Sequence, residues 1–356
     1  MNAATLPETF QPNNHSKSAI EYGPVQKETE DELRKILKDH YAIAGVKSIE
    51  QVKELEMNSN NFKIVHDGGK VLLRKNISNN AADKVMLEHR LLEYCNQHSL
   101  KVPNAILTKN GNIFAEHGGA LYTAYTFLEG NHYAGSIKEL REAAEEIAKL
   151  HIALRDLPFK EDIGKKFSML TNSYDLGLLS RLHESAKDGT DFGRLLLDNH
   201  AFIERNTKEV LKKLPELNKN LQIIHGDLHP HNFIFGNESL RSILDFGEMR
   251  EGPLLEDIAY SAYRLIRQYV VNNSISGAKL KDAISEAMSV YLENYTKHNS
   301  VSKSDTELIS TMIKHIALKK VFFILSKNYL EMNTKWNFDL PKHINSLREA
   351  EYFERS

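Results

Sequence analysis

The chain has a single cysteine, Cys95, among its 356 residues. An internal disulfide needs two cysteines, so none can form, and nothing in the cysteine usage points to an oxidising compartment. Charge of one sign is also scarce, because the formal net charge is only -2 with histidine neutral. General nucleic-acid binders carry a basic patch or a high isoelectric point, so the charge balance predicts no nucleic-acid partner.

Long hydrophobic runs are missing as well. The longest run near the C-terminus, "VFFIL" at 321–325, is five residues long, whereas a membrane-spanning helix needs about 20. The N-terminal "MNAATLPETFQPNNHSK" lacks the charged-then-apolar layout of a signal peptide. These absences predict a soluble, cytoplasmic protein with no membrane contact. A monomer or a homodimer is expected, and the sequence does not choose between them.

The pattern along the chain predicts an arm and two lobes. Residues 1–27 are polar and are expected to form a flexible arm. Residues 28–128 contain "TEDELRKILKDHYA", where Thr29 and Glu32 have capping-box spacing for a helix start, and a hairpin signal at 67–69. A helix over 81–98 and strands over 104–117 and 120–130 complete the predicted first lobe.

Residues 129–356 change character and read mostly as helices. The helix "SIKELREAAEEIAKLHIAL" has Ser136 and Glu139 at capping-box spacing. The stretch 223–250, "IIHGDLHPHNFIFGNESLRSILDFGEMR", predicts a short strand, a loop and a hairpin that turns near Gly236-Asn237. The fold class is therefore expected to be α+β, with a small antiparallel sheet lobe and a larger helical lobe.

The stretch 223–250 carries the strongest chemical signal. Asn232 follows Asp227 by five residues, and Asp245 opens "DFG" thirteen residues after Asn232. Magnesium-dependent phosphoryl transfer needs one carboxylate near the attacking hydroxyl and hard oxygen ligands for the metal, and kinases supply them in this order. The spacing predicts Asp227 as the catalytic base and Asn232 with Asp245 as Mg²⁺ ligands. A zinc site at His225, His229 and His231 is the rival interpretation, although Asp-Asn-Asp suits magnesium better.

A kinase also needs a strand cation for the nucleotide phosphates and a helix carboxylate that holds the cation. Glu88 has Val85, Leu91 and Leu92 at helical spacing, so it lies on an apolar helix face where an unpaired carboxylate is costly. The strand "KVLLRKN" offers Arg74 or Lys75, which point to opposite faces. Pairing of Glu88 with Lys84 is the alternative.

The expected phosphate-covering hairpin, "EMNSNNFKIV", has no glycine. Ser59, Asn60 and Asn61 are candidates for binding phosphate oxygens through backbone amides or side chains. A plain polar turn explains the same residues equally well.

"HGDLHPHN" followed by "ILDFGE" resembles the aminoglycoside phosphotransferase and choline kinase-like small-molecule kinases, and the likeness extends over most of the chain from about residue 45. The resemblance implies a protein-kinase-like fold, ATP as co-substrate with GTP as an alternative, and Mg²⁺. It favours Arg74 over Lys75. "NSNNFKIVHDGGK" resembles the homoserine kinase-like branch.

The resemblance also implies roles for residues outside the metal set. His225 and Asp257 are expected to support the catalytic loop. The backbone from Thr126 through Phe127 to Leu128, in "YTFLEG", is expected to bind adenine as the connector between the lobes.

Asp257 follows Asp245 by only twelve positions. A protein kinase places a long activation segment there, so the expected acceptor is a hydroxylated small molecule: an amino alcohol or hydroxy amino acid, a sugar or amino sugar, or an aminoglycoside-type antibiotic. A nucleotide-binding regulatory pseudokinase and a protein kinase stay open as alternatives.

Overall fold

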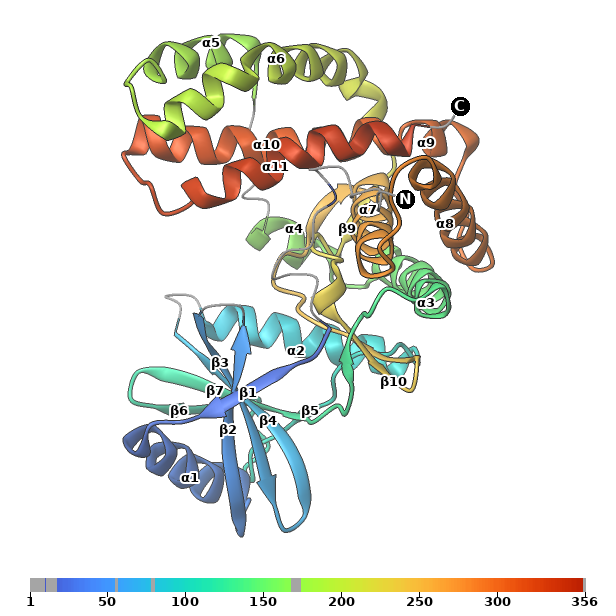
Figure 1. Cartoon of the computed structure of the whole chain (residues 1–356). Coiled ribbons are helices and arrows are strands. Elements are labelled where there is room, and N and C mark those ends of the chain that lie inside the picture. Colours follow the sequence, from blue (N-terminus) through green and yellow to red (C-terminus); the bar gives the residue numbers. More distant parts are fainter. Residues whose placement is uncertain (1–9, 11–17, 55–56, 78–80, 168–173, 355–356) are drawn as a thin grey trace, which may run out of the picture. The chain divides into compact units, whose positions relative to one another are not determined.

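The structure is a computed structural model, and it describes residues 10, 18–54, 57–77, 81–167 and 174–354 (Figure 1). The chain forms two units. The sheet unit comprises Asn13–Ala153 and Pro230–Gly247, and the helical unit comprises Met1–Pro12, Leu154–His229 and Glu248–Ser356. The sheet unit extends to Ala153 and includes the hairpin of the 223–250 stretch, whereas the sequence placed a lobe boundary after Leu128.

The sheet unit contains an antiparallel sheet in the order β1-β2-β3-β4-β7-β5, with β6 also paired to β7. The predicted hairpin at 67–69 is present between β3 and β4, where Ile64 pairs with Val71. The bounds are β1 Glu21–Pro24, β2 Val46–Glu54, β3 Met57–His66, β4 Gly69–Asn76, β5 Ala105–Ile106, β6 Ala115–His117 and β7 Ala120–Thr126. Strand β1 corrects part of the expected arm, and the rest of that expectation falls mostly outside the described residues.

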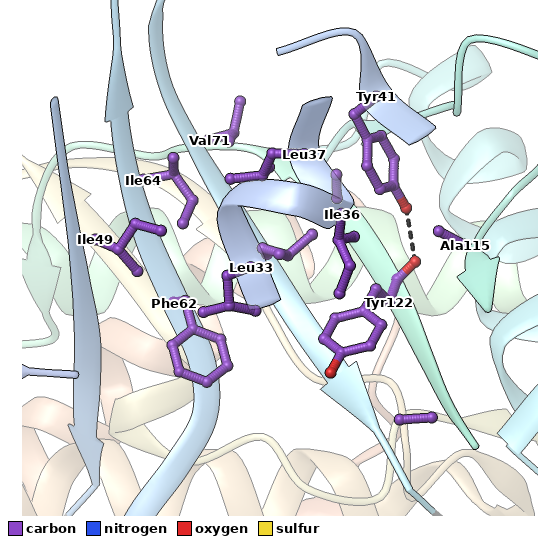
Figure 2. Close-up of a cluster of buried hydrophobic side chains, with 13 residues drawn as sticks. Leu33, Ile36, Leu37, Tyr41, Ile49, Phe62, Ile64, Val71, Ala115 and Tyr122 are labelled. Atoms are coloured by element: carbon purple, nitrogen blue, oxygen red, sulfur yellow. Dashed lines mark hydrogen bonds between the residues drawn. The ribbon is translucent and has the colours of Figure 1, made fainter. Parts of the chain in front are cut away.

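Helix α1 (Lys27–Tyr41) packs its apolar stripe on this sheet, as Figure 2 shows. Leu33, Ile36 and Leu37 follow helical spacing and are buried against strand residues such as Phe62 and Ile64. Full burial of an aliphatic or aromatic side chain of this size contributes about 1.5–3 kcal/mol. This stripe therefore provides much of the stability that holds β3 and β4 in place.

The two predicted capping boxes have different outcomes. At α3 (Ile137–Arg155) the Ser136 hydroxyl accepts the Glu139 N–H at 3.1 Å, and the Glu139 carboxylate accepts the Ser136 N–H at 3.1 Å, so that box is confirmed. At α1 the prediction is wrong. The helix begins two residues earlier than Thr29, at Lys27, and Gln26 is the N-cap with no side-chain capping bond.

Two further parts of the sheet unit position its site residues. Helix α2 (Ala81–Gln97) carries Glu88. A small sheet in the order β11-β10-β8 joins β8 (Asn131–His132), β10 (Phe233–Gly236) and β11 (Ser239–Ile243), preceded by the short helix η3 (Pro230–Asn232). Asn237 and Glu238 have positive φ angles of 54° and 58°, so the predicted turn near Gly236-Asn237 is confirmed.

The helical unit is built from helices around one short two-stranded sheet, in which β9 pairs with β12. The strand β12 was not predicted. The helices and strands of the helical unit are α4 Lys160–Phe167, α5 Leu176–Ser185, α6 Asp191–Leu217, β9 Leu221–Ile224, β12 Arg250–Pro253, α7 Leu254–Asn272, α8 Lys279–Thr296, α9 Lys303–Glu307, α10 Ile309–Glu331, η4 Asn337–Asp339, α11 Leu340–Glu349 and η5 Ala350–Phe353. No helix in the described ranges is long and apolar enough to cross a membrane.

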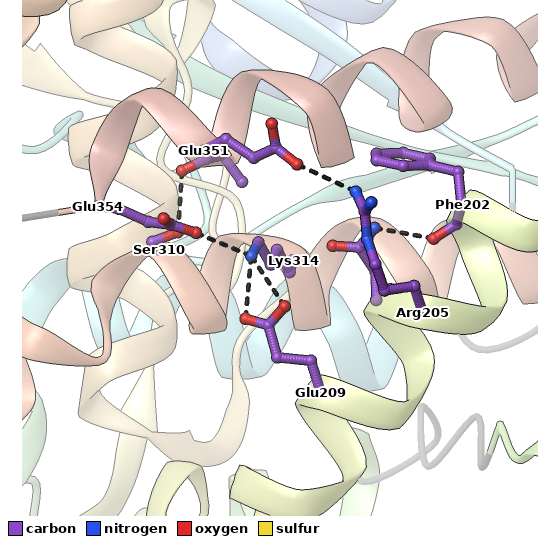
Figure 3. Close-up of polar contacts among 9 residues, drawn as sticks. Phe202, Arg205, Glu209, Ser310, Lys314, Glu351 and Glu354 are labelled. Carbon is purple, nitrogen blue, oxygen red and sulfur yellow. Dashed lines mark hydrogen bonds and ion pairs between the residues drawn. The ribbon is translucent and has the colours of Figure 1, made fainter.

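A buried lysine ties the C-terminal part of this unit together, as Figure 3 shows. Lys314 of α10 is 3% exposed, and its ammonium contacts Glu209 of α6 at 2.9 Å and Glu354 at 3.0 Å. Burial lowers the pKa of a lysine, but hydrogen bonds to these two carboxylates outweigh it and raise the pKa of Lys314. Lys314 therefore stays charged, and its two carboxylate partners stabilise the buried ammonium.

Candidate active site

The loop that follows β9 is held by one buried carboxylate. Asp257, in the first turn of α7, is 1% exposed and accepts the backbone N–H of His225 at 2.6 Å and that of Gly226 at 2.9 Å. The His225 ring in turn accepts the backbone N–H of Asp227 at 3.3 Å. These bonds fix the backbone on which Asp227 stands, as expected for the two supporting residues.

Gly226 is required by the shape of the same loop. Its φ is +82°, a left-handed conformation that side chains other than glycine's disfavour. A Cβ atom added there would lie 2.5 Å from the carbonyl oxygen of Glu248. The loop therefore passes too close to the chain before β12 for any larger residue.

Asp227 is half-buried and surrounded by groups that favour its ionised form. His229 Nε2 lies 3.3 Å from one carboxylate oxygen, and the Tyr260 hydroxyl donates to the other at 3.4 Å. Arg264 donates to the Tyr260 oxygen at 3.1 Å. Burial opposes ionisation, but the hydrogen bond and charge of His229, with the charges of His225 and Arg264, outweigh it and hold the pKa of Asp227 well below its ordinary value. Asp227 is therefore a carboxylate throughout the physiological pH range.

Tyr260 is a donor and not a second base. Burial raises the pKa of Tyr260 to about 12, so its hydroxyl keeps its proton at neutral pH. It therefore donates to Asp227 while it accepts from Arg264. Of Asp227, Tyr260 and Arg264, only Asp227 can accept a proton from a substrate hydroxyl.

In the sheet unit, the predicted metal ligands lie at the open end of one hairpin. Phe233 pairs with Ile243, and the next residues outward, Asn232 and Leu244, are joined by a backbone hydrogen bond of 2.8 Å. Asn232 is buried and Asp245 is exposed. Asn232 and Asp245 are therefore brought to the same end of the hairpin, as their spacing predicted.

The backbone at Asp245 is unusual. Its φ is +59°, which costs energy for a residue with a side chain and is most tolerated by Asn and Asp. Its carboxylate accepts the Gly247 N–H at 3.3 Å, which supports this turn. An amide and a carboxylate offer the hard oxygen atoms that Mg²⁺ prefers, so the residues fit this metal. The zinc alternative is not supported, since no group of three or more His, Cys, Asp or Glu suited to a metal occurs among the described residues.

The strand cation and the helix carboxylate meet as predicted. Arg74 of β4 contacts Glu88 of α2 at 3.2 Å and also donates to the Asn61 side chain at 3.1 Å. Lys75, on the other face of β4, lies 3.8 Å from Glu32 of α1. The structure therefore pairs Glu88 with Arg74 and leaves Lys75 on the side of the sheet that α1 covers.

Strands β2 and β3 pair as the expected hairpin, and the alternative of a plain polar turn at its polar residues is wrong. Ser59, Asn60 and Asn61 lie within strand β3 and not in a turn. Ser59 is buried, and its hydroxyl accepts both the backbone N–H and the side-chain amide of Asn61 at 3.0 Å. Contact of these residues with nucleotide phosphates remains a prediction.

The predicted adenine-binding segment begins at the end of β7. Thr126 is the last residue of this strand, and its N–H donates to the Asn104 carbonyl at 2.9 Å. Phe127 and Leu128 follow the strand and are partly exposed. Their contact with a nucleotide remains a prediction.

Sequence reasoning assigned no role to three groups around Asp227. His229 stands two positions after Asp227, and Tyr260 and Arg264 follow Asp257 at three and seven residues. Spacings of three and seven place residues on one helix face, so the position of Asp257 was a usable signal for both. His231 was also unassigned, and it stacks on His132 in the sheet unit with ring centroids 4.9 Å apart.

Comparisons with solved structures agree with this fold. Spectinomycin phosphotransferase in complex with ADP and spectinomycin matches with a TM-score of 0.63 and 14% identity, over 93% of this chain and 98% of that one. A microcompartment-associated aminopropanol kinase matches with a TM-score of 0.60 and 13% identity, over 90% and 95%. At such identities the likeness shows the fold alone, which is the predicted α+β, protein-kinase-like fold.

Sequence comparisons find curated relatives named homoserine kinase. The protein from Bartonella henselae is 27% identical over 209 residues, 58% of this chain and 61% of that relative. The protein from Brucella ovis is 23% identical over 293 residues, 82% of this chain and 81% of that relative. The matched segment thus spans less than two thirds of the Bartonella henselae relative's length.

A family model described as "Phosphotransferase enzyme family" matches residues 51–274. The match covers well over half of the chain and includes Arg74, Glu88 and the whole 223–250 stretch. This chain belongs to the phosphotransferase enzyme family.

Proposed function

We propose that the protein is a magnesium-dependent kinase that transfers the γ-phosphate of ATP, or of GTP, to a hydroxyl group of a small molecule. The observation that carries the proposal is Asp227. It is an ionised, half-buried carboxylate on a loop whose backbone is fixed by Asp257. Catalysis of phosphoryl transfer rests on such positioning and on charge neutralisation rather than on covalent chemistry.

The proposed role of Asp227 follows from its low pKa. A carboxylate with a lowered pKa is a weak base, so it orients the acceptor hydroxyl early and receives the proton as the new O–P bond forms. The Tyr260 hydroxyl and His229 keep the carboxylate in a fixed orientation. The acceptor oxygen can then be aimed along the line of attack on the phosphorus atom.

Asn232 and Asp245 are the proposed ligands of a divalent cation, which when bound neutralises charge on the nucleotide phosphates. Arg74 is proposed to contact the phosphates, with Glu88 and Asn61 fixing the direction of its guanidinium. Ser59, Asn60 and the segment 126–128 are proposed to complete nucleotide binding.

A small acceptor is favoured over a protein substrate by the segment between Asp245 and Asp257. In the structure this segment contains strand β12 and the start of α7, so a peptide-binding activation segment has no room in it. Relatives and neighbours named homoserine kinase, aminopropanol kinase and spectinomycin phosphotransferase support a small hydroxylated acceptor.

Asp227→Asn tests the proposal, with exposed Asp198→Asn as the matched control in the same unit. The general-base contribution predicts a loss of transfer of about 10²- to 10⁴-fold, measured as ADP release and phosphorylated product over a panel of alcohols. Binding of ATP with Mg²⁺ is expected to stay within about threefold, because Asp227 faces the acceptor. Full activity of Asp227→Asn refutes the proposal. Nucleotide binding without transfer to any alcohol by the wild type supports the regulatory pseudokinase instead.

A further inference from the structure

Three cations lie on three helices of the helical unit that contact one another, since α10 packs against both α7 and α11 and Tyr263 of α7 donates to Ser346 of α11 at 3.0 Å. They are Arg264 on α7, Lys320 on α10 and Lys342 on α11, and we call them the cationic cluster. Helices α10 and α11 run alongside each other in Figure 1, and α10 also packs against α7. Arg264 and Lys342 are half-buried, while Lys320 is exposed.

The cluster contrasts with other cations on the same helices, which have carboxylates of their own. Arg267 contacts Glu349 at 2.9 Å, and Lys319 contacts Glu256 at 2.8 Å. Lys342 has only Asp339, at 3.8 Å, which is beyond hydrogen-bonding distance. Arg264 donates to the neutral Tyr260, and its charge stabilises the Asp227 carboxylate beyond it. Among the residues that the structure describes, no ion pair of Lys320 is seen.

These cations affect the pKa values of the groups around them. Burial and the charge of Arg264 lower the pKa of Lys342 to about 8, with smaller contributions from Lys320 and Arg267 that the Asp339 carboxylate opposes. Burial, Lys342, Lys320 and Arg264 also hold the pKa of His343 well below its ordinary value. Each group is thus affected by the same cations, so a bound anion would relieve the repulsion among them.

The cluster is linked to the proposed catalytic carboxylate. Arg264 donates to the Tyr260 hydroxyl, which donates to Asp227. An acceptor whose hydroxyl lies at Asp227 can therefore direct another group toward Arg264, one helical turn from Tyr260. A cationic group there would face like charges, whereas an anionic group would find charge-assisted donors.

We infer that the acceptor is a small hydroxylated molecule with an anionic group, a carboxylate or a phosphate, and that Lys342 and Lys320 together with Arg264 bind this group. The inference rests on the proposed kinase function and narrows its acceptor. In the reaction, the bond between the γ-phosphorus and the bridging oxygen of the nucleotide breaks, and a bond from the acceptor hydroxyl oxygen to that phosphorus forms. Asp227 receives the hydroxyl proton, and the nucleotide diphosphate leaves.

Matched acceptors test this assignment. One pair is L-homoserine and its neutral-carboxamide analogue, a second is glycerol 3-phosphate and glycerol, and spectinomycin serves as a cationic comparison. ADP release gives kcat and KM, and phosphorus NMR identifies the product. We expect the anionic member of at least one pair to have a kcat/KM about 10- to 100-fold higher than its neutral partner, the range for losing hydrogen bonds to a charged group. The responding pair distinguishes a carboxylate from a phosphate.

Variants assign the preference to the cluster. Lys342→Met and Lys320→Met should each raise KM for the anionic acceptor by about tenfold, and the preference for the anionic over the neutral acceptor should fall by the same factor. Exposed Lys281→Met on α8 is the matched control and should change neither value. Thermal unfolding of each variant verifies that its fold is intact.

Several outcomes overturn the inference. It fails if the neutral or cationic acceptors are phosphorylated as well as the anionic ones, or if Lys342→Met slows both members of a pair equally. If no acceptor is phosphorylated, the proposed kinase function fails for this panel, and calorimetric titration with ADP and Mg²⁺ then decides the inference separately. Equal binding of L-homoserine and its carboxamide, and of glycerol 3-phosphate and glycerol, would refute the anion site itself.

Discussion

Asp257→Ala is expected to destabilise the helical unit more than any surface substitution. Asp257 accepts two backbone N–H groups, at 2.6 and 2.9 Å, in an environment where it is 1% exposed. A hydrogen bond to a charged group contributes about 1.5–3 kcal/mol, and truncation leaves both amides buried without their acceptor. Water entering the space left by the carboxylate recovers part of this sum, so the expected loss in free energy of unfolding is about 3–5 kcal/mol.

The assay is urea unfolding, followed by fluorescence of Trp336, the single tryptophan, which lies in the helical unit. With an unchanged slope, a loss of this size lowers the midpoint by about 1–2 M urea. Asp175→Ala is the matched control, because Asp175 also accepts a backbone N–H, at 2.7 Å, but is an exposed helix N-cap. Its expected cost is about 1 kcal/mol. Equal costs for the two variants would refute the reasoning from burial.

Three further outcomes follow from the site. Gly226→Ala should lower both stability and kcat, since φ is +82° there, and unfolding together with steady-state rates measures both. Arg74→Met should raise KM for ATP about tenfold in the same rate assay. Lys75→Met should leave this KM unchanged, because Lys75 lies on the face of β4 that α1 covers. Equal effects of the two substitutions would contradict the strand geometry. Because the pKa of Lys342 is lowered to about 8, this lysine loses its charge above that pH, and kcat/KM for an anionic acceptor should then fall. If kcat/KM of the Lys342→Met variant falls in the same way over the same pH series, Lys342 is not the cause.

Much of the site was predictable because its residues are close in sequence. Asp227, Asn232 and Asp245 fall within one strand-loop-hairpin stretch. Their spacing therefore predicted that Asn232 and Asp245 lie at the same end of the hairpin. The Arg74–Glu88 pair is a longer-range contact, yet it followed from local logic. A carboxylate on an apolar helix face needs a cation, and the neighbouring strand offers Arg74 or Lys75, between which the family resemblance favoured Arg74.

Other features depend on contacts that no local pattern contains. Strand β12, with the sequence "REGP", lacks alternation and forms because β9 provides its partner. A plain polar turn was one of two interpretations of Ser59, but its hydroxyl accepts hydrogen bonds from Asn61 within strand β3. The predicted helix start at Thr29 is wrong because α1 already begins at Lys27. Thr29 therefore lies inside the helix and cannot be its N-cap.

The cationic cluster was the least predictable feature, because its members come from three helices and span residues 264 to 342. Arg264 is the residue through which this cluster meets the catalytic loop, since it supports Tyr260 and thereby Asp227. Its removal is expected to lower kcat and to raise the acceptor KM together, so Arg264 alone cannot separate catalysis from recognition. Among the described residues, no hydrogen bond or ion pair joins Lys342 to Asp227 or Tyr260. A Lys342→Met variant that changes only KM would therefore assign anion recognition to the cationic cluster.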